Sequence, residues 1–172
     1  MVKLVSSITE REFNDEALAG VQQEAISLAS ERTDEMLSVY NSKSDTFDGR
    51  YVCADTFKEI FPAFENKEDR AKVNNAIHNA AAVLSATQFE EVINRVEPDK
   101  DQAIFLTGIP GAGKTTTITN DGKLSERTKI VFEGQLANPT SGIPKIQKCL
   151  DADLTVAIVA LNLEASKDLE NN

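Results

Sequence analysis

A glycine-rich loop that ends in a lysine and a threonine is the part of this sequence best suited to chemistry. Residues 108–115 read Gly-Ile-Pro-Gly-Ala-Gly-Lys-Thr and fit the pattern G-x-x-x-x-G-K-[ST] at every fixed position. Glycines let such a loop curl so that backbone N–H groups face phosphate oxygens, while the lysine reaches the β- and γ-phosphates and the threonine hydroxyl binds Mg²⁺. The loop therefore predicts a nucleotide-binding site formed by Gly108, Pro110, Gly111, Ala112, Gly113, Lys114, Thr115 and Thr116.

The segments on either side of this loop fit a strand and a helix. Residues 102–107 form a short apolar run that is typical of a strand, and residues 115–119 can open a helix whose N-terminal dipole favours anions. Strand, loop and helix in that order are the context that the motif requires. A Gly-rich turn without a ligand would not need the Lys-Thr pair at this spacing.

Two carboxylates follow predicted strands elsewhere in the chain. Asp55 comes directly after residues 50–54, and Glu133 follows residues 129–132. In phosphoryl transfer, a carboxylate near the acceptor hydroxyl can take its proton. Asp55 is the candidate base, and Glu133 can orient a substrate or the water shell of the metal. Two simpler roles stay open: Asp55 as a helix N-cap and Glu133 as a solvated residue at a strand end.

The elements that must position these residues alternate between strand and helix. We expect strands at 50–54, 102–107, 129–132 and 154–161, and helices at 8–40, 68–94 and 143–150. This alternation predicts an α/β fold: a three-layer, P-loop NTPase-like, mostly parallel sheet with helices on both faces. Because ligands of such sheets bind at the carboxyl ends of the strands, Asp55, the glycine-rich loop and Glu133 are expected to share one cleft.

The N-terminal part of the chain is expected to be helical. Thr9 and Glu12 have the spacing of a capping box, apolar residues recur at helical intervals, and Gly20 can divide the segment into two helices. We therefore expect an N-terminal helical segment over residues 1–45, followed by a P-loop kinase-like α/β domain over residues 46–172.

Composition excludes several classes of partner. The chain has 172 residues and a formal net charge of −10, which argues against a broad electrostatic grip on nucleic acid or anionic lipid. No apolar run approaches the length of a membrane span, and two cysteines and one histidine make neither a disulfide framework nor a zinc motif. These features predict a cytoplasmic protein that binds neither nucleic acid nor membrane.

Three motifs of the chain resemble those of the zeta-toxin family. Residues 55–64, Asp-Thr-Phe-Lys-Glu-Ile-Phe-Pro-Ala-Phe, look like D-x-F-[KR]-x-x-H-P-x-[FY], and residues 132–136, Phe-Glu-Gly-Gln-Leu, look like [IVF]-E-G-T-[LF]. The glycine-rich loop is similar to the family's G-G-x-P-G-[AS]-G-K-[ST]. The apolar strand that ends Val-Ala-Leu-Asn-Leu at 159–163 also follows the family pattern. The resemblance covers roughly residues 50–170, and only the loop motif is specific by itself.

Zeta toxins are P-loop kinases that phosphorylate UDP-N-acetyl-sugars and so poison the synthesis of cell-wall precursors. The resemblance implies a phosphotransferase that uses ATP or GTP with Mg²⁺. It implies Asp55 and Lys114 as catalytic residues, with Thr115 on the metal. Its substrate-binding residues would be Lys58, Glu133 and Gln135.

Zeta toxins belong to toxin–antitoxin systems and are restrained by helical antitoxins that block the nucleotide pocket. The resemblance therefore implies a helical antitoxin as a partner, or residues 8–40 acting as an inhibitor in cis. Packing of these residues against the sheet is the simpler role, because most amphipathic helices pack in this way.

The sequence departs from the family pattern in three respects. Asp55 precedes the loop, whereas the corresponding motif follows it in most zeta toxins, and Phe61 and Gln135 replace the family's His and Thr. No arginine follows Arg127, although the family carries arginines there that clamp the γ-phosphate; such an arginine changes the rate by about 10³–10⁵. We expect a truncated C-terminus. Two other readings stay open: a degenerate or truncated nucleotide-binding protein without catalysis, and a P-loop kinase or NTPase with another acceptor.

Overall fold

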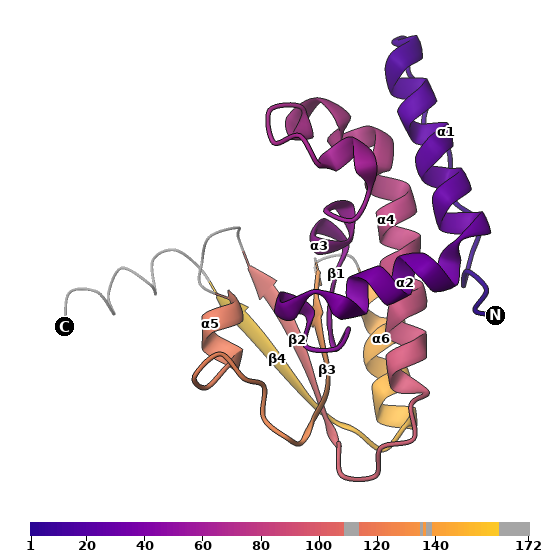
Figure 1. The fold of residues 1–172 in the computed structure, drawn as a ribbon. Coiled ribbons are helices and arrows are strands. Elements are labelled where there is room, and N and C mark those ends of the chain that lie inside the picture. Colours follow the sequence, from indigo (N-terminus) through magenta and orange to yellow (C-terminus); the bar gives the residue numbers. More distant parts are fainter. Residues whose placement is uncertain (109–113, 135, 137–138, 162–172) are drawn as a thin grey trace, which may run out of the picture. The chain divides into compact units, whose positions relative to one another are not determined.

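The computed structural model describes residues 1–108, 114–134, 136 and 139–161 of an α/β chain. Two compact units divide the chain, Met1–Glu91 and Val92–Asn172 (Figure 1). Among the described residues, no helix is long and apolar enough to cross a membrane. The division into domains at residue 45 stays a prediction.

The first unit contains helices and one short strand. Its elements are α1 (Glu16–Glu31), α2 (Thr33–Ser42), β1 (Tyr51–Cys53), α3 (Ala54–Lys58) and α4 (Arg70–Ile93), with single 3-10 turns at Ser44–Thr46 and Pro62–Phe64. The last residues of α4 belong to the second unit. The predicted strand at 50–54 and the predicted long helix at 68–94 are confirmed.

The helical prediction for residues 8–40 is right from residue 16 onward and wrong before it. The side chains of Gln22 and Asn79 form hydrogen bonds with backbone groups of residues 9–11, which precede α1. Gln22 accepts from Arg11 N at 2.9 Å and donates to Arg11 O at 3.0 Å, and Asn79 donates to Thr9 O at 2.7 Å. These long-range bonds replace the capping box predicted at residues 9–12. The N-cap of α1 is instead Asp15, whose carboxylate accepts from two first-turn N–H groups.

The division between the first two helices also differs from the prediction. α1 continues through Gly20, and the break falls at Arg32, whose φ of −122° and ψ of 35° are not helical. The core of this unit lies between small residues on α1 and α4 and larger side chains on α2 and α3. Its buried members are Ala25, Ala29, Met36, Leu37, Tyr40, Phe57, Phe61, Ile77, Ala80, Ala81 and Leu84.

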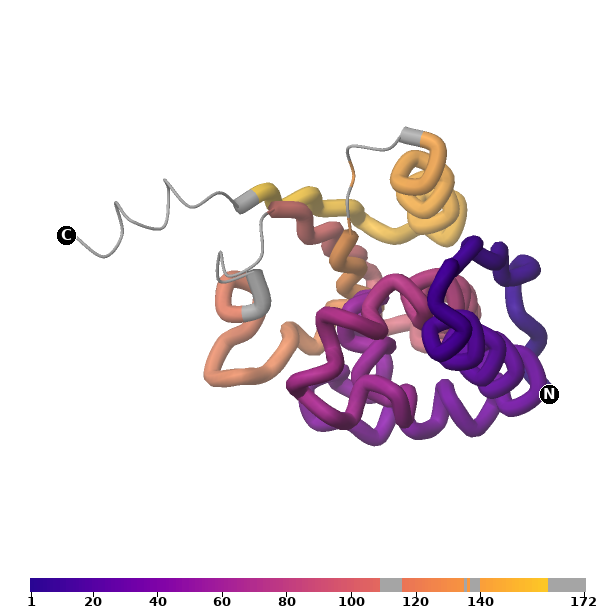
Figure 2. Tube along the Cα trace, turned by 90° about the horizontal axis from the view of Figure 1, so that it is seen from above, coloured from indigo at the N-terminus to yellow at the C-terminus, as the bar shows by residue number. Residues whose placement is uncertain are grey.

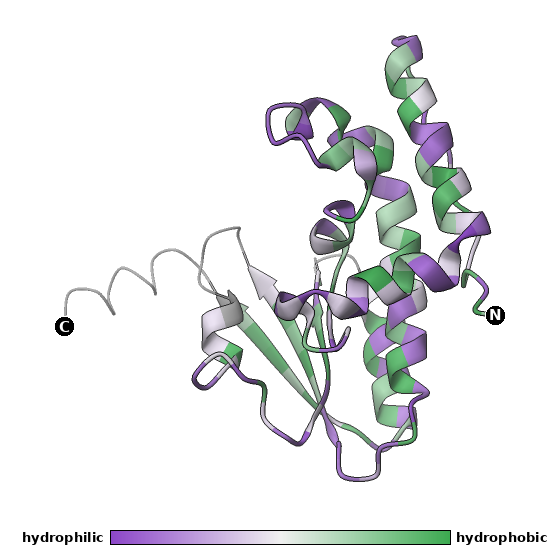
Figure 3. Ribbon diagram, viewed as in Figure 1, coloured by the Kyte–Doolittle hydropathy of each residue, from purple (hydrophilic) through white to green (hydrophobic). Residues whose placement is uncertain are grey.

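Three parallel strands form the sheet of the second unit. They are β2 (Gln102–Gly108), β3 (Thr128–Glu133) and β4 (Thr155–Leu161), and β2 pairs with both of the others. All three strands were predicted within one or two residues. The apolar residues of β2 and β3 are largely buried, whereas β4 is largely exposed, with Ile158 at 57%; Figure 3 shows hydrophobic residues along these strands.

Helices lie on both faces of this three-stranded sheet. α5 (Lys114–Ile118) follows β2 and lies on one face, while α6 (Pro139–Asp151) connects β3 to β4 on the other (Figures 1 and 2). α6 begins four residues earlier than the predicted 143–150, because a proline is tolerated in the first turn, where its missing N–H has no intrahelical partner.

Candidate nucleotide and acceptor sites

The carboxyl edge of the sheet in the second unit holds two of the predicted site residues. Gly108 ends β2 and Glu133 ends the neighbouring strand β3. The parallel register pairs Leu106 with Glu133, and the N–H of Gly134 donates to Leu106 O at 3.2 Å. Strand pairing therefore brings the Glu133 backbone beside the point where the glycine-rich loop leaves the sheet.

The first glycine of the loop has a conformation that few other residues adopt. Gly108 has a φ of 144°, which is strained for L-amino acids with a side chain. Helix α5 begins at Lys114, so strand, loop and helix follow in the predicted order, and Thr116 in its first turn is exposed. The loop residues Pro110, Gly111, Ala112 and Gly113 lie outside the described residues.

Gly134, which follows Glu133, lies where a residue with a side chain would not fit. A Cβ atom on Gly134 would lie 2.7 Å from Cε1 of Phe132, closer than real Cβ contacts allow. The aromatic ring therefore covers this backbone only because the residue is glycine. The predicted substrate residue Gln135 lies outside the described residues.

A half-buried lysine that the sequence did not single out lies near the same strand end. The Lys145 ammonium on α6 lies 5.2 Å from the centroid of the Phe132 ring, within the range of a cation–π interaction. Burial lowers the pKa of Lys145 and raises the pKa of Glu133. No motif marks Lys145, since its place depends on how α6 packs on the sheet.

Both arginines of the second unit lie at the opposite, amino edge of the sheet. Arg127 precedes β3 and pairs with Asp101, which precedes β2; its Nε donates to Oδ1 at 2.9 Å and its Nη2 donates to Oδ2. The backbone carbonyl of Arg95 accepts from Lys129 at the start of β3. Neither arginine therefore supplies charge at the carboxyl edge, where the glycine-rich loop begins.

Asp55 lies in the first unit, in the first turn of the five-residue helix α3. Its side chain is 81% exposed, and its Oδ1 accepts from Lys58 Nζ at 2.7 Å. The N-cap of α3 is Cys53, which makes no side-chain cap bond, so the alternative role of Asp55 as an N-cap is wrong. An exposed carboxylate held at one oxygen is able to meet a solvent-borne ligand with the other.

Lys58 is buried, unlike its partner. Its side chain is only 5% exposed, and its ammonium also donates to Asn74 Oδ1 on α4 at 2.8 Å. His78 lies one turn further along α4 and is half-buried. Burial lowers the pKa of its imidazole most, and the positive charges of Lys58 and Arg11 lower it further. The negative charge of Asp55 acts in the opposite direction and raises this pKa. The sequence did not predict this group, because α3 and α4 contribute to it from separate segments.

Tyr40 on α2 fixes the junction between β1 and α3. Its hydroxyl donates to Tyr51 O at 2.6 Å and accepts from Cys53 N at 3.2 Å, and burial raises the pKa of the phenol. Its ring stacks on Phe57 of α3, with centroids 3.6 Å apart and planes 2° from parallel. One side chain thus holds both the strand end and the helix that carries Asp55.

The structure thus assigns the predicted residues to two units. Asp55 and Lys58 lie in the first, whereas Gly108, Lys114, Thr115, Thr116 and Glu133 lie in the second. The shared cleft expected from the sequence stays a prediction, as do the roles of the individual residues. Over the described ranges, no three His, Cys, Asp or Glu side chains converge as a metal site.

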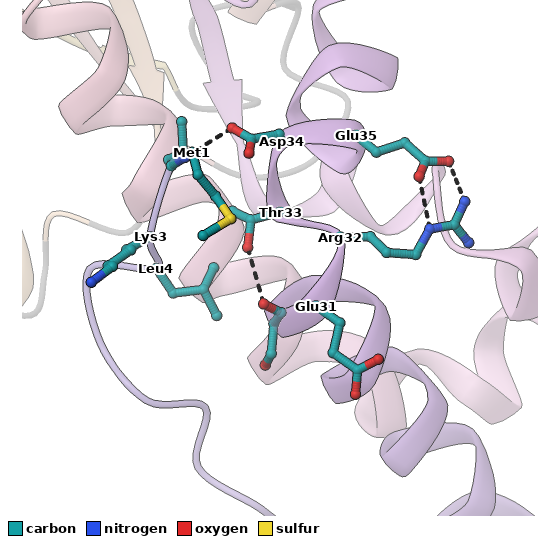
Figure 4. Close-up of a pocket in the computed structure, with 10 residues that line it drawn as sticks. Met1, Lys3, Leu4, Glu31, Arg32, Thr33, Asp34 and Glu35 are labelled. Atoms are coloured by element: carbon teal, nitrogen blue, oxygen red, sulfur yellow. Dashed lines mark hydrogen bonds and ion pairs between the residues drawn. The ribbon is translucent and has the colours of Figure 1, made fainter.

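Two hollows lie away from the predicted residues. One of about 440 Å³ is lined by residues 1–4 and 30–35, where Val2 N donates to Asp34 Oδ1 at 2.9 Å (Figure 4). Another, of about 360 Å³, lies at the amino edge of the sheet beside Lys129, whose buried ammonium pairs with Glu97 at 3.2 Å. In the first hollow a backbone N–H already binds Asp34, and in the second Lys129 already binds Glu97, so neither hollow displaces the predicted site.

Comparison with known proteins leaves the family open. No model of a known protein family matches the chain, and no curated protein matches it. The resemblance to zeta toxins therefore rests on the motifs alone.

Proposed function

We propose that this chain is a phosphotransferase of the P-loop kinase class, similar to zeta toxins, which transfers the γ-phosphate of ATP or GTP to a UDP-N-acetyl-sugar. The proposed fold is the three-layer P-loop NTPase type. The chain would act in the cytoplasm, and a helical antitoxin or its own residues 8–40 would restrain it.

One observation carries the proposal: the G-x-x-x-x-G-K-[ST] sequence joins the carboxyl end of a central parallel strand to the start of a helix. Gly108 ends β2 with a φ of 144°, and α5 begins at Lys114. Glu133 ends the next strand in register with Leu106. Phosphate groups bind at helix N-termini and at the carboxyl ends of strands in α/β sheets, so this placement of the motif supports the proposal.

The donor set of the loop fits a nucleotide with Mg²⁺. Backbone N–H groups of the loop and the Lys114 ammonium would hold the phosphates, and the Thr115 hydroxyl would be the protein ligand of the metal. Mg²⁺, when bound, neutralises charge on the phosphate oxygens.

On the acceptor side, Asp55 would take the proton of the sugar hydroxyl. The hydroxyl oxygen would bond to the γ-phosphorus while the bond from that phosphorus to ADP breaks and ADP leaves. Glu133 would bind the sugar. Burial raises the pKa of its carboxyl group, because removal from water disfavours the ionised form.

The test is an incubation of the intact chain with ATP, Mg²⁺ and UDP-N-acetylglucosamine, with mass spectrometry of the sugar nucleotide. We expect a product heavier by one phosphoryl group, formed about 10²–10³ times more slowly by the Lys114→Ala variant. Equal product from both proteins would contradict the role of the loop, and product on other metabolites only would assign a different acceptor.

A second candidate function is nucleotide binding without rapid transfer. The arginines of the second unit favour it, since Arg127 pairs with Asp101 at the amino edge and the Arg95 backbone binds Lys129 at the same edge. A P-loop kinase that lacks an arginine on the γ-phosphate is expected to be slower by about 10³–10⁵. Calorimetric binding of ATP by a chain that makes no phosphorylated sugar would select this second candidate.

A further inference from the structure

Three polar side chains of the first unit form a connected series that ends at Asp55. Asn74 Oδ1 accepts from Lys58 Nζ at 2.8 Å, and the same ammonium donates to Asp55 Oδ1 at 2.7 Å. We infer that Lys58 and Asn74 are positioning residues for Asp55: Asn74 orients the buried Lys58 ammonium, which fixes one oxygen of the Asp55 carboxylate so that the other faces the acceptor. This inference rests on the proposed function.

Because Lys58 is buried, it is placed to hold Asp55 and not to bind a substrate directly. Its side chain is 5% exposed, whereas that of Asp55 is 81% exposed. A ligand that arrives from solvent meets the carboxylate and not the ammonium. A buried ammonium also requires partners, because an uncompensated charge removed from water costs several kcal/mol. Asn74 and Asp55 occupy two of its three N–H donors.

The lengths of the two helices explain why Asp55 needs an external support. α3 contains five residues, so its few backbone hydrogen bonds hold the helix that carries Asp55 weakly. α4 runs from Arg70 to Ile93 and is the long helix of the unit (Figure 1). Isolated helices as short as α3 are marginal in water. The bond from Lys58 to Asn74 attaches the short helix to the long one at the residue that carries the Asp55 contact.

The chemical benefit is control of one carboxylate rotamer. General bases work when the accepting oxygen is held in a narrow geometry, and a displacement of about 1 Å can lower a rate by about 10². With Oδ1 bound by Lys58 three residues later on the same helix, rotation of the carboxylate is restricted. Oδ2 is then left to receive the proton of the acceptor hydroxyl.

The kinetic test compares two substitutions at Asn74 with a control at the end of α4. Asn74→Leu removes the acceptor at similar volume, and Asn74→Asp keeps an oxygen acceptor for Lys58. Asn94→Leu, at an exposed position just after the helix, is the matched control. We expect Asn74→Leu to lower kcat for phosphate transfer to UDP-N-acetylglucosamine by about tenfold, with KM changed less than twofold. Asn74→Asp is expected to restore most of the rate, and Asn94→Leu to keep the wild-type rate.

His78 provides a second readout that does not depend on activity. It is the single histidine of the chain; burial lowers its pKa most, and the positive charge of Lys58 lowers it further. We expect proton NMR titration to show a higher His78 pKa in Lys58→Met and a changed pKa in Asn74→Leu, where the ammonium is released. The pKa should stay at the wild-type value in Asn94→Leu.

The outcomes separate the two proposals. Transfer by the wild type together with unchanged kcat in Asn74→Leu would overturn the positioning role alone, and an unchanged His78 pKa in Asn74→Leu would overturn the link from Asn74 to Lys58. No transfer by the wild type would overturn the proposed function. A tenfold loss in Asn74→Leu with recovery in Asn74→Asp supports the inference.

Discussion

The surroundings of Asp55 and the carboxyl edge of the three-stranded sheet position their predicted site residues by different physical means. Around Asp55, polar groups bind one another: Lys58 holds the carboxylate, and Asn74 holds Lys58. At the sheet edge, parallel register and close backbone packing place Gly108 and Glu133.

This difference predicts opposite sensitivities to mutation. The surroundings of Asp55 lose function when a polar atom is removed, because a partner is then left unsatisfied. The sheet edge loses its structure and function when an atom is added, since a side chain at Gly134 would collide with Phe132. The five predictions below, from the largest expected effect to the smallest, test this contrast.

Asp55→Asn is expected to have the largest effect, a loss of about 10²–10⁴ in kcat for phosphate transfer, because the amide cannot take a proton from the acceptor. ATP affinity, measured by calorimetry, should not change. Asp45→Asn in the same unit, where the carboxylate is 59% exposed and lies 3.6 Å from Lys43, is the control. Wild-type rates in Asp55→Asn would remove Asp55 from the chemistry.

Lys114→Ala is expected to reduce the rate of phosphate transfer by about 10²–10³. This is the usual effect of removing one group that stabilises charge in a transition state. It should also weaken ATP binding, unlike Asp55→Asn. Lys123→Ala is the matched control, since this lysine is exposed in the same unit. Unchanged ATP affinity in Lys114→Ala would show that residues 108–115 do not hold phosphate.

Gly134→Ala is expected to lower the free energy of unfolding by about 1–3 kcal/mol, the usual cost of overpacking. The new Cβ would lie 2.7 Å from the Phe132 ring. Gly20→Ala is the contrasting variant: nothing lies within 4 Å of its Cβ position inside α1, so we expect a gain of about 0.5–1 kcal/mol. Denaturant unfolding measures both, and a stable Gly134→Ala would contradict the tight packing at this edge.

Tyr40→Phe is expected to cost about 1–2 kcal/mol of unfolding free energy, because the hydroxyl bonds to Tyr51 O and Cys53 N are lost in a buried region. The stacked contact with Phe57 is retained in this variant. The midpoint of urea unfolding is the measurement. A midpoint equal to that of the wild type would show that these bonds do not hold the β1–α3 junction.

The smallest effect concerns His78. Because burial and nearby positive charges lower its folded pKa, the unfolded chain binds this proton more readily. The contribution of His78 to the unfolding free energy is therefore complete above about pH 6.5 and decreases as pH falls toward the folded pKa. NMR titration should give a pKa below 6.5 that rises in Lys58→Met; a value above 6.5 would contradict the arrangement around Lys58.

The sequence predicted the elements whose apolar pattern is strong and local. β2, β3, β4 and α4 follow such patterns and were found within one or two residues. The start of α1 was missed because Gln22 and Asn79 bind backbone groups of residues 9–11 from distant positions, which no capping pattern reports.

The candidate sites divide in the same way. Motif spacing indicated Asp55, Lys58, Gly108 and Glu133, and the pairing of Asp55 with Lys58 follows from their positions three residues apart on one helix. Asn74 could not be predicted, because its contact with Lys58 joins two helices across a loop. Lys145 became visible only through the packing of α6 on Phe132.

The central claim is that the loop binds the nucleotide and Asp55 acts on the acceptor. Its most direct test measures γ-phosphate transfer to UDP-N-acetylglucosamine and ATP affinity in the same preparations of wild type, Lys114→Ala and Asp55→Asn. We predict transfer and binding in the wild type, loss of both in Lys114→Ala, and loss of transfer alone in Asp55→Asn. Absence of transfer by the wild type, or full transfer by Asp55→Asn, would contradict the claim.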